Sequence, residues 1–533
     1  AGYYFSWASM SNDGFYSRDP SYDVDETSVF GKLAFSPDER SEAMVSVNSV
    51  TSDNSLPTSL PVVGGQLLSD IEPGFDRRSN INLPTASFHQ EELRLTSSYS
   101  RELGAGVSFT NTFGYRDIQY KFEESGDIIG APFDLIANTL MMYPFSLQTD
   151  EEVYYEEARL ALGAVPGGLD DELLVGASYE RTTGFRAGDL IYTDAVTFGI
   201  PLDFLDPVVP QRSDWEYDPF GGDEYSLGSL GLYFQYQLAP VARVELTASG
   251  RYDRLRMENA ETFQTGQPDI DATFEAFSPK VSALLRVLEA AEAGRLGAVD
   301  VNLYATYSEA FKPPRTPSAL NVAGTDPPLD PEDIASYEVG VKTALADGRA
   351  RFAATYFNMT RDGIVVSTRQ GPFFLPSNAG GQDFQGLEGE AAWGPTSALT
   401  LAGNAVFYYN RFGDFVIQTS GGDTDLTGNR LPLVPDRIFN LGASLEPIED
   451  VGLTAGLKRV GDRFVDQLNV LPLDAYTLLD ASVWWSPGPV RVTVSARNLL
   501  DHRYFTSGDT SLAESVEIGA PRQLAISVSF TND

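Results

Sequence analysis

The sequence predicts an all-β fold, a transmembrane antiparallel β-barrel, because apolar and polar residues alternate along most of the chain. Alternation with a period of two is typical of strands whose two faces meet different surroundings. No stretch approaches the eighteen or so apolar residues of a membrane-spanning helix. In a large barrel only alternate residues face lipid, and this arrangement fits a hydrophobic fraction of 42%.

The alternating segments number about twenty and are about ten residues long, the length that crosses a bilayer at a tilt. The first begins at once, without a secretory leader, so we expect the chain to be processed or truncated at its front. The expected strands, in order, are 2–9, 28–36, 42–51, 89–101, 107–122, 152–165, 173–186, 225–238, 243–258, 274–287, 302–311, 335–345, 349–361, 382–393, 399–409, 437–446, 453–464, 476–485, 490–504 and 521–530.

Short and long connections alternate between these segments. Pairs such as Asp347 with Gly348, and Pro487 with Gly488, predict tight turns on one side. The sequence of the connection 288–299 is compatible with either a helical turn or an extended link. In outer-membrane barrels the short connections are periplasmic and the long ones extracellular, so the C-terminus is expected in the periplasm. Aromatic girdles are expected at the short turns and the long-loop ends. Their members are Trp393, Trp484 and Trp485 at the former, and Tyr408 and Tyr409 at the latter.

The segment 243–258 shows the two faces most clearly, because charged residues occupy one of them. Charges that point inward are expected in a barrel with a polar lumen and are unusual in a packed sandwich. We therefore expect Arg243, Arg251 and Asp253 to face the lumen. The expected lipid-facing residues are Leu246, Leu401, Leu453 and Val494.

The composition excludes several classes of function. The chain carries 75 acidic and 37 basic residues, a formal charge of −38, which argues against nucleic-acid binding. It has no cysteine and two histidines, so neither a disulfide framework nor a thiolate or histidine metal site is expected, and no cofactor is predicted. Asp423 and Asp425 could bind calcium, but their spacing favours a solvated turn.

Six short motifs occur in the order of one known family. Together they resemble a TonB-dependent outer-membrane receptor, and the strand rhythm extends the resemblance towards the N-terminus. This family has a barrel of about 22 strands plugged by an N-terminal domain. The resemblance implies that 1–533 is the barrel domain, and that the plug and the first two barrel strands are missing. Alternatively, one of the expected segments contains a whole hairpin, so that all barrel strands are present and only the plug is missing. The motifs are 307–314, 336–342, 378–380, 386–390, 498–504 and 519–522.

The resemblance implies energy-coupled uptake of a scarce large nutrient, most often a ferric siderophore. The implied partners are outer-membrane lipid, the plug domain, the inner-membrane TonB complex acting through the missing N-terminal part, and an extracellular small molecule. A competing class is a barrel without active transport, acting as a pore or as a scaffold that presents loops. We find no catalytic constellation and expect no enzyme. Haem is disfavoured, because no histidine lies between His89 and His502.

Aromatic and basic residues in the long loops are the ligand-binding candidates. Large iron chelates are amphipathic and often anionic, so aromatic surfaces with arginines suit them. Packing of the loops against each other is the alternative for each residue. The candidates, from loops at 52–87, 190–224 and 366–381, are Phe75, Arg77, Arg78, Trp215, Tyr217, Phe373 and Phe374.

Both ends of the chain are expected to be barrel strands. Residues 1–9 should border an open edge or strands that another segment supplies, because unpaired backbone groups in lipid cost about several kcal/mol each. Family members usually end on an aromatic residue, whereas here Thr531, Asn532 and Asp533 follow Phe530. We still expect Phe530 to be the lipid-facing terminal anchor.

Overall fold

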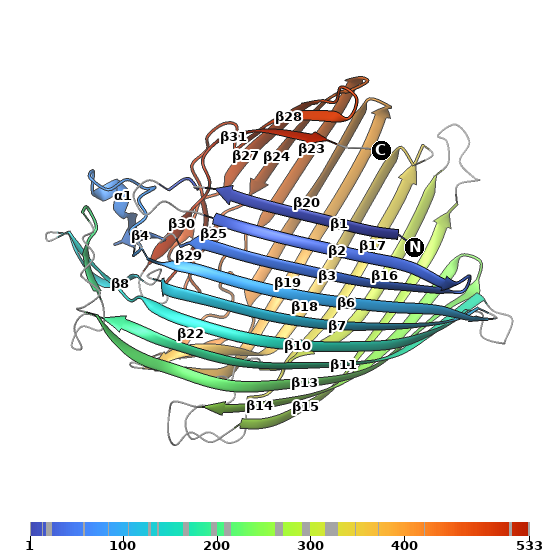
Figure 1. Ribbon diagram of the computed structural model, residues 1–533, viewed down its shortest axis with the longest axis horizontal. Helices are drawn as coiled ribbons and strands as arrows, with labels where there is room; N and C mark the ends of the chain where they lie inside the picture. The colour runs from blue at the N-terminus through green and yellow to red at the C-terminus, as the bar shows by residue number, and fades with distance from the viewer. Residues whose placement is uncertain are drawn as a thin grey trace.

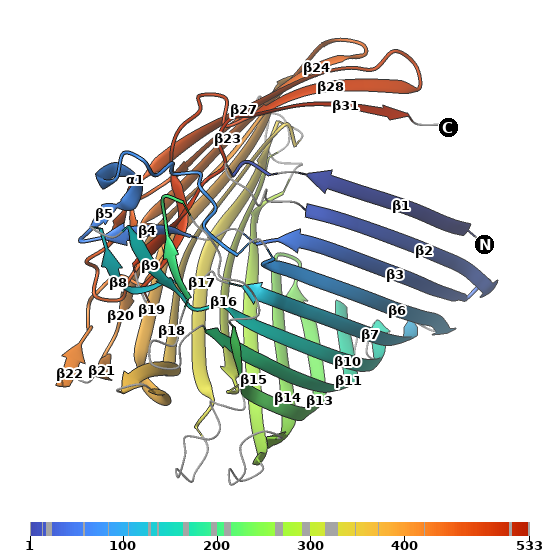
Figure 2. The ribbon, with the colours of Figure 1, turned by 60° about the vertical axis from the view of Figure 1, so that its left-hand side comes forward.

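The structure is a computed structural model. It describes residues 2–530 except 13, 17–23, 57–58, 84, 105, 126–128, 136–137, 164–169, 193–199, 207–214, 262–269, 290–298, 315–328, 347, 371–372, 420–421 and 511–513. One sheet of 20 strands dominates it, and every neighbouring pair is antiparallel and adjacent along the wall. The sheet curls around a lumen (Figures 1 and 2). The predicted number of strands and their antiparallel order are therefore confirmed.

The wall strands follow one another in chain order, joined by tight turns at one end and long connections at the other. We call these the short-turn end and the long-loop end. The strands are β1 (Gly2–Asn12), β2 (Val24–Asp38), β3 (Ser41–Ser55), β6 (Ser87–Gly104), β7 (Val107–Ser125), β10 (Phe145–Gly163), β11 (Asp170–Tyr192), β13 (Glu216–Val241), β14 (Val244–Glu261), β15 (Ile270–Leu288), β16 (Asp300–Lys312), β17 (Glu332–Leu345), β18 (Ala350–Gln370), β19 (Phe373–Thr396), β20 (Leu399–Phe412), β23 (Arg437–Ile448), β24 (Val451–Val460), β27 (Tyr476–Trp485), β28 (Val490–Arg497) and β31 (Gln523–Phe530).

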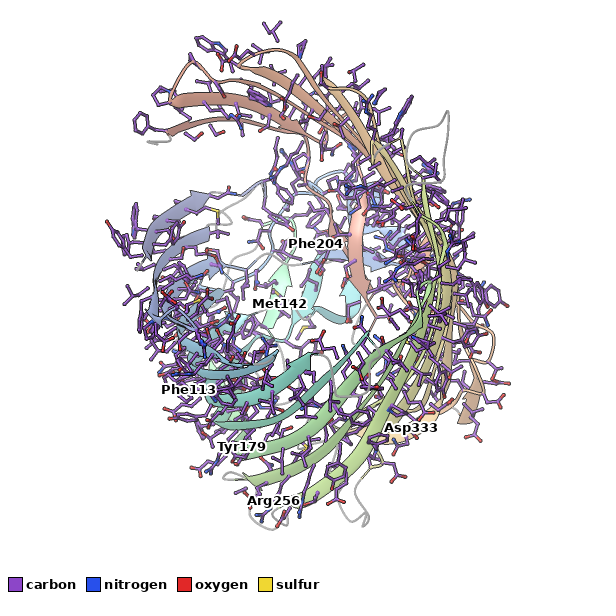
Figure 3. The ribbon with its side chains drawn as sticks, turned by 90° about the vertical axis from the view of Figure 1, so that its right-hand side faces the viewer. Phe113, Met142, Tyr179, Phe204, Arg256 and Asp333 are labelled. Carbon is purple, nitrogen blue, oxygen red and sulfur yellow. The ribbon has the colours of Figure 1, made fainter. Side chains whose placement is uncertain are left out.

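The two faces of the wall differ as the alternation predicts. Leu246, Leu453 and Val494 are exposed on the outer face, and Leu401 shares that face because it pairs with the exposed Trp393. Figure 3 shows outward side chains such as Phe113 and Tyr179 around the rim of the sheet.

The inner face of the wall is polar. Arg251 and Asp253 alternate with the outward residues of β14 and form an ion pair of 2.7 Å. Tyr225 and Tyr233 donate hydrogen bonds to Glu151 and Glu157, at 2.9 and 2.5 Å. Polar side chains thus satisfy one another within β14 and, over the intervening β11, between β13 and β10.

The wall is open between its first and last strands. β1 pairs with β2, and β31 pairs with β28, whereas no pairing of described residues joins β1 to β31. Figure 3 shows the resulting C-shaped outline. The expectation that β1 borders an open edge agrees with this arrangement. What fills the gap stays a prediction.

The short elements lie in the long connections, and they carry the largest apolar core. Nineteen buried residues gather there, including Leu68, Phe204 and Val516. Among the described residues, no helix is long and apolar enough to span a membrane. The short elements are β4 (Leu60–Val63), β5 (Gln66–Leu67), α1 (Leu68–Ile71), β8 (Ile129–Asp134), β9 (Thr139–Met142), β12 (Ile200–Asp203), β21 (Val416–Thr419), β22 (Gly422–Asp425), β25 (Arg463–Phe464), β26 (Pro472–Leu473), β29 (Phe505–Asp509) and β30 (Ser515–Ile518).

Several boundaries differ from the prediction. Arg243 lies in the turn before β14 rather than within the strand, and it donates to the Val287 carbonyl. β28 ends at Arg497 because Asn498 adopts a positive φ of 46°, and its side chain bonds to the His502 and Ala520 carbonyls. β13 runs for 26 residues, more than a bilayer crossing needs, because its pairing with β11 continues into the long-loop end. Most of the connection 288–299, namely 290–298, and residues 531–533 lie outside the described residues.

Candidate ligand-binding mouth

Loops from both ends of the sequence pack together over the long-loop end of the wall. β4 follows β3, whereas β30 precedes the last strand, yet Val516 pairs with Leu60 and Ser515 with Pro61. The Val62 amide also donates to the Glu514 carbonyl at 2.8 Å. We call the nineteen-residue core and the loops that carry it the loop cap. In Figure 3 its residues Met142 and Phe204 lie across the opening of the barrel.

Two of the predicted ligand residues form part of this core. Phe75 is 4% exposed and meets Phe204 edge to face, with ring centroids 6.0 Å apart. Trp215 is 8% exposed and belongs to the same cluster. Both side chains thus pack in the core that joins the loops, as the alternative of loop packing expects.

Arg77 lies at the edge of the same core and stacks on an aromatic ring. Its guanidinium carbon is 5.3 Å from the centre of the Phe505 ring. Burial and the nearby Arg503 lower the pKa of Arg77, while Asp70 and Asp76 oppose that shift. The structure thus brings Arg77 close to a second arginine that the sequence did not single out.

The other candidates are dispersed. Arg78 is exposed, and its backbone amide donates to an Asp76 carboxylate oxygen at 2.9 Å. Tyr217 is exposed near the start of β13. Phe373 and Phe374 begin β19, where their backbones pair with Gln370 and Arg369. The side chains of these two phenylalanines lie outside what the structure describes. The candidates therefore do not form one cluster.

Arg463 is a residue of the mouth that sequence reasoning missed. It is 3% exposed, and one of its amino groups donates to the Phe505 and Thr506 carbonyls at 2.7 and 2.8 Å. Its guanidinium lies 5.6 Å from the centre of the Tyr476 ring, and burial lowers its pKa. Arg463 fixes the backbone beneath the ring on which Arg77 stacks. No local pattern marks it, because its partners lie about forty residues away in the sequence.

A smaller apolar cluster forms beside the loop cap, and we call it the side lobe. Its buried residues come from β18, β20 and the loop after β20, and they are Ile364, Phe412, Phe415, Ile417, Leu426 and Leu431.

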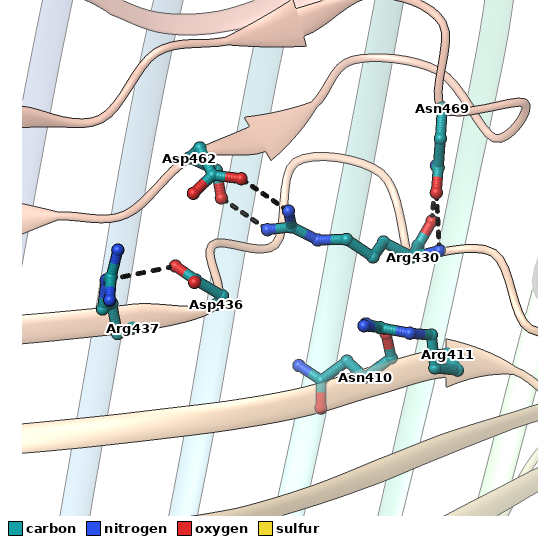
Figure 4. Close-up of polar contacts among 7 residues, drawn as sticks. All are labelled: Asn410, Arg411, Arg430, Asp436, Arg437, Asp462 and Asn469. Atoms are coloured by element: carbon teal, nitrogen blue, oxygen red, sulfur yellow. Dashed lines mark hydrogen bonds and ion pairs between the residues drawn. The ribbon is translucent and has the colours of Figure 1, made fainter.

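Polar contacts join the side lobe to the loop that carries Arg463. Arg430 binds the Asp462 carboxylate at 2.6 Å, and Asn469 binds the Arg430 backbone (Figure 4). The hydrogen bond from Arg430 lowers the pKa of Asp462. The side lobe and the loop cap are thus held together by one ion pair and its surrounding amides.

The calcium interpretation gains no support in the part of the chain that the structure describes. No group of three or more acidic or histidine side chains is arranged there to hold a metal ion. Asp425 instead accepts a hydrogen bond from the Thr427 amide at 2.9 Å, and its hydrogen bonds to Thr427 lower its pKa. This geometry is that of a solvated turn.

Residues 10–499 match the family model described as TonB dependent receptor-like, beta-barrel. The chain is 25% identical over 334 residues to the ferrioxamine receptor of Yersinia enterocolitica, covering 61% of this chain and 41% of that protein. It is 24% identical over 373 residues to the ferrioxamine B receptor of Salmonella typhimurium, covering 68% and 48%. The matches thus span less than half the length of these relatives.

Two solved structures have the same fold. The siderophore receptor PiuA from Acinetobacter baumannii superimposes with a TM-score of 0.83 at 16% identity, covering 99% of this chain and 77% of that one. The ferric-catecholate import receptor Fiu from E. coli in its closed form gives a TM-score of 0.79 at 15% identity, covering 99% and 77%.

Proposed function

The chain belongs to the TonB-dependent receptor β-barrel family, and from this premise we propose that it forms the wall and mouth of a receptor that imports a ferric siderophore. Barrels of this family are outer-membrane proteins, and the family consists of transport receptors rather than enzymes. In the proposed orientation the long loops are extracellular and the C-terminus is periplasmic. The plug and the contact with the TonB complex would lie in a part of the protein that precedes this barrel.

The loop cap is the single observation that carries this proposal. Leu68, Leu140 and Phe204 are fully buried in its core. A passive pore gains nothing from a packed cover over its mouth, whereas a receptor uses ordered loops to capture a ligand and exclude the rest. The relatives named as receptors for ferrioxamine support a ferric chelate as the cargo.

Within the mouth, we propose that Arg77, Arg78, Tyr217, Phe373 and Phe374 contact the chelate. Phe75 and Trp215 support those contacts from behind, since both are buried in the loop core. Arginine with aromatic surfaces suits an amphipathic, anionic chelate.

Growth on defined iron sources tests the proposed function. A strain that lacks the gene should fail to grow on one ferric siderophore in iron-depleted medium, and the full-length gene should restore growth on that siderophore alone. Equal growth of the two strains on every ferric siderophore of the panel would contradict the proposal. A restored passage of many unrelated solutes would favour the competing class, an open pore.

A further inference from the structure

A buried glutamate is shared by two arginines on the inner face of β6 and β7. Glu92 lies 2.7 Å from Arg94 and 3.2 Å from Arg116, and its side chain is 9% exposed. Leu93, between Glu92 and Arg94, is exposed on the outer face, so its two neighbours point into the lumen. Arg116 also has a buried Nε without a hydrogen-bond partner among the described atoms.

A second shared glutamate occurs on β16, β17 and β18. Glu332 lies 2.5 Å from Arg361 and 3.6 Å from Lys312, and its side chain is 3% exposed. The exposed Tyr307 sets the outer face of β16, which places Lys312 on the inner face. Figure 3 looks along the lumen and shows the strands of the two groups on opposite sides of it.

Each group contains two positively charged side chains and one negatively charged glutamate, so it carries a net positive charge. Two other inner-face pairs contain one cation for one carboxylate, namely Arg251 with Asp253 and Arg286 with Glu245. In each group one cation keeps about half of its side chain exposed to the lumen, Arg94 at 51% and Lys312 at 47%, while the other pairs with the carboxylate from a more buried position. The surplus is notable in a chain whose net charge is −38.

The outer face near the long-loop end shows the opposite imbalance. There Arg256 is shared by two carboxylates, Glu258 at 2.8 Å and Asp271 at 2.9 Å. Excess positive charge is thus found on the inner face in the two glutamate groups, although acidic residues dominate the whole chain. A ligand that enters the lumen meets cations on both sides.

We propose that these two lumenal pairs, Arg94 with Arg116 and Lys312 with Arg361, select ferric chelates of net negative charge. This inference rests on the proposed function and names the chemical class of its substrate. Lys312 and Glu332 lie at the long-loop ends of β16 and β17, whereas Arg116 lies midway along β7. Carboxylate or catecholate oxygens of a chelate would accept charge-assisted hydrogen bonds from the surplus cations.

The double variant Arg94→Gln with Lys312→Gln tests the inference. Each change removes one cation and leaves the glutamate paired, with Arg116 in one group and Arg361 in the other. The matched control is Arg181→Gln with Arg254→Gln, which removes the same charge from the outer face. The probes are an anionic ferric tris-catecholate and a neutral ferric trihydroxamate, titrated against the full-length purified receptor.

The unaltered receptor should bind the anionic chelate more tightly, and added salt should weaken that binding. The lumenal double variant should lose about tenfold in affinity for the anionic chelate, a figure reduced for the partial exposure of Arg94 and Lys312. Its affinity for the neutral chelate should not change. The outer-face control should bind both chelates like the unaltered protein. The charge-conserving variant Arg94→Lys with Lys312→Arg should retain most of the affinity for the anionic chelate.

Two results would overturn the inference in distinguishable ways. If the unaltered receptor binds the two chelates equally and the lumenal variant changes neither, charge selection fails while the proposed function stands. If the unaltered receptor binds no ferric chelate, both fail. Equal amounts of heat-resistant barrel in the outer membrane for all variants show that folding is not the cause of any difference.

Discussion

Replacing Phe204 with alanine should loosen the loop cap and leave the barrel wall intact. Phe204 is fully buried, and its ring meets that of Phe75 at 6.0 Å. Truncating a buried phenylalanine costs about 3–5 kcal/mol. Because all but one of the nineteen core residues, Ile191 of β11, lie outside the wall strands, the cost should fall on opening of the cap. The open state of the cap should become about a hundredfold to several thousandfold more populated.

Limited proteolysis of outer-membrane vesicles measures this opening. Cleavage within the loops at 56–86 and 200–206 should accelerate in the Phe204 variant, while the heat resistance of the barrel on a gel stays unchanged. Tyr217→Ala, which truncates an exposed ring, is the control and should alter neither. The reasoning is refuted if loop cleavage keeps its original rate, or if the wall loses its heat resistance together with the cap.

Three further predictions concern the mouth and the end of the wall. Replacing Arg77 and Arg78 together with glutamine should weaken binding of an anionic chelate at unchanged barrel abundance; unchanged affinity with faster loop cleavage would leave them a structural role. Lowering the pH should break the Arg430–Asp462 contact only below pH 3.8, the ordinary pKa of an aspartate, because the lowered pKa of Asp462 keeps its carboxylate charged at higher pH. Loss of protection from hydrogen exchange in that loop measures the break. Phe530→Ser should reduce outer-membrane levels more than deletion of residues 531–533, and equal effects would reject Phe530 as the terminal anchor.

The wall could be predicted from the sequence because its signal is local. Alternation over about ten residues identifies each strand, and turn residues such as those at 487–488 separate neighbours. The inward Arg251 and the outward Leu246 follow directly from that period. The boundary at Asn498 was missed because a positive φ, fixed by contacts with His502 and Ala520, ends the strand before the alternation does.

The mouth could be predicted only in part, since its contacts join distant segments. Phe75 was recognised as a loop aromatic, but its burial depends on Phe204, far along the chain. Arg463 has no distinctive neighbours in sequence, and its importance appears only when the Phe505 carbonyl is placed beside it. An aromatic or basic residue in a loop looks the same in the sequence whether it faces a ligand or another loop.

Uptake of radioactive iron tests the central claim most directly. The full-length gene is expressed in iron-starved cells that lack other receptors, with and without a functional TonB protein, and a ferric siderophore carries the label. The account predicts saturable uptake that requires both the gene and TonB. Uptake that proceeds equally without TonB, or that is absent for every ferric siderophore in cells that assemble the barrel, would contradict it.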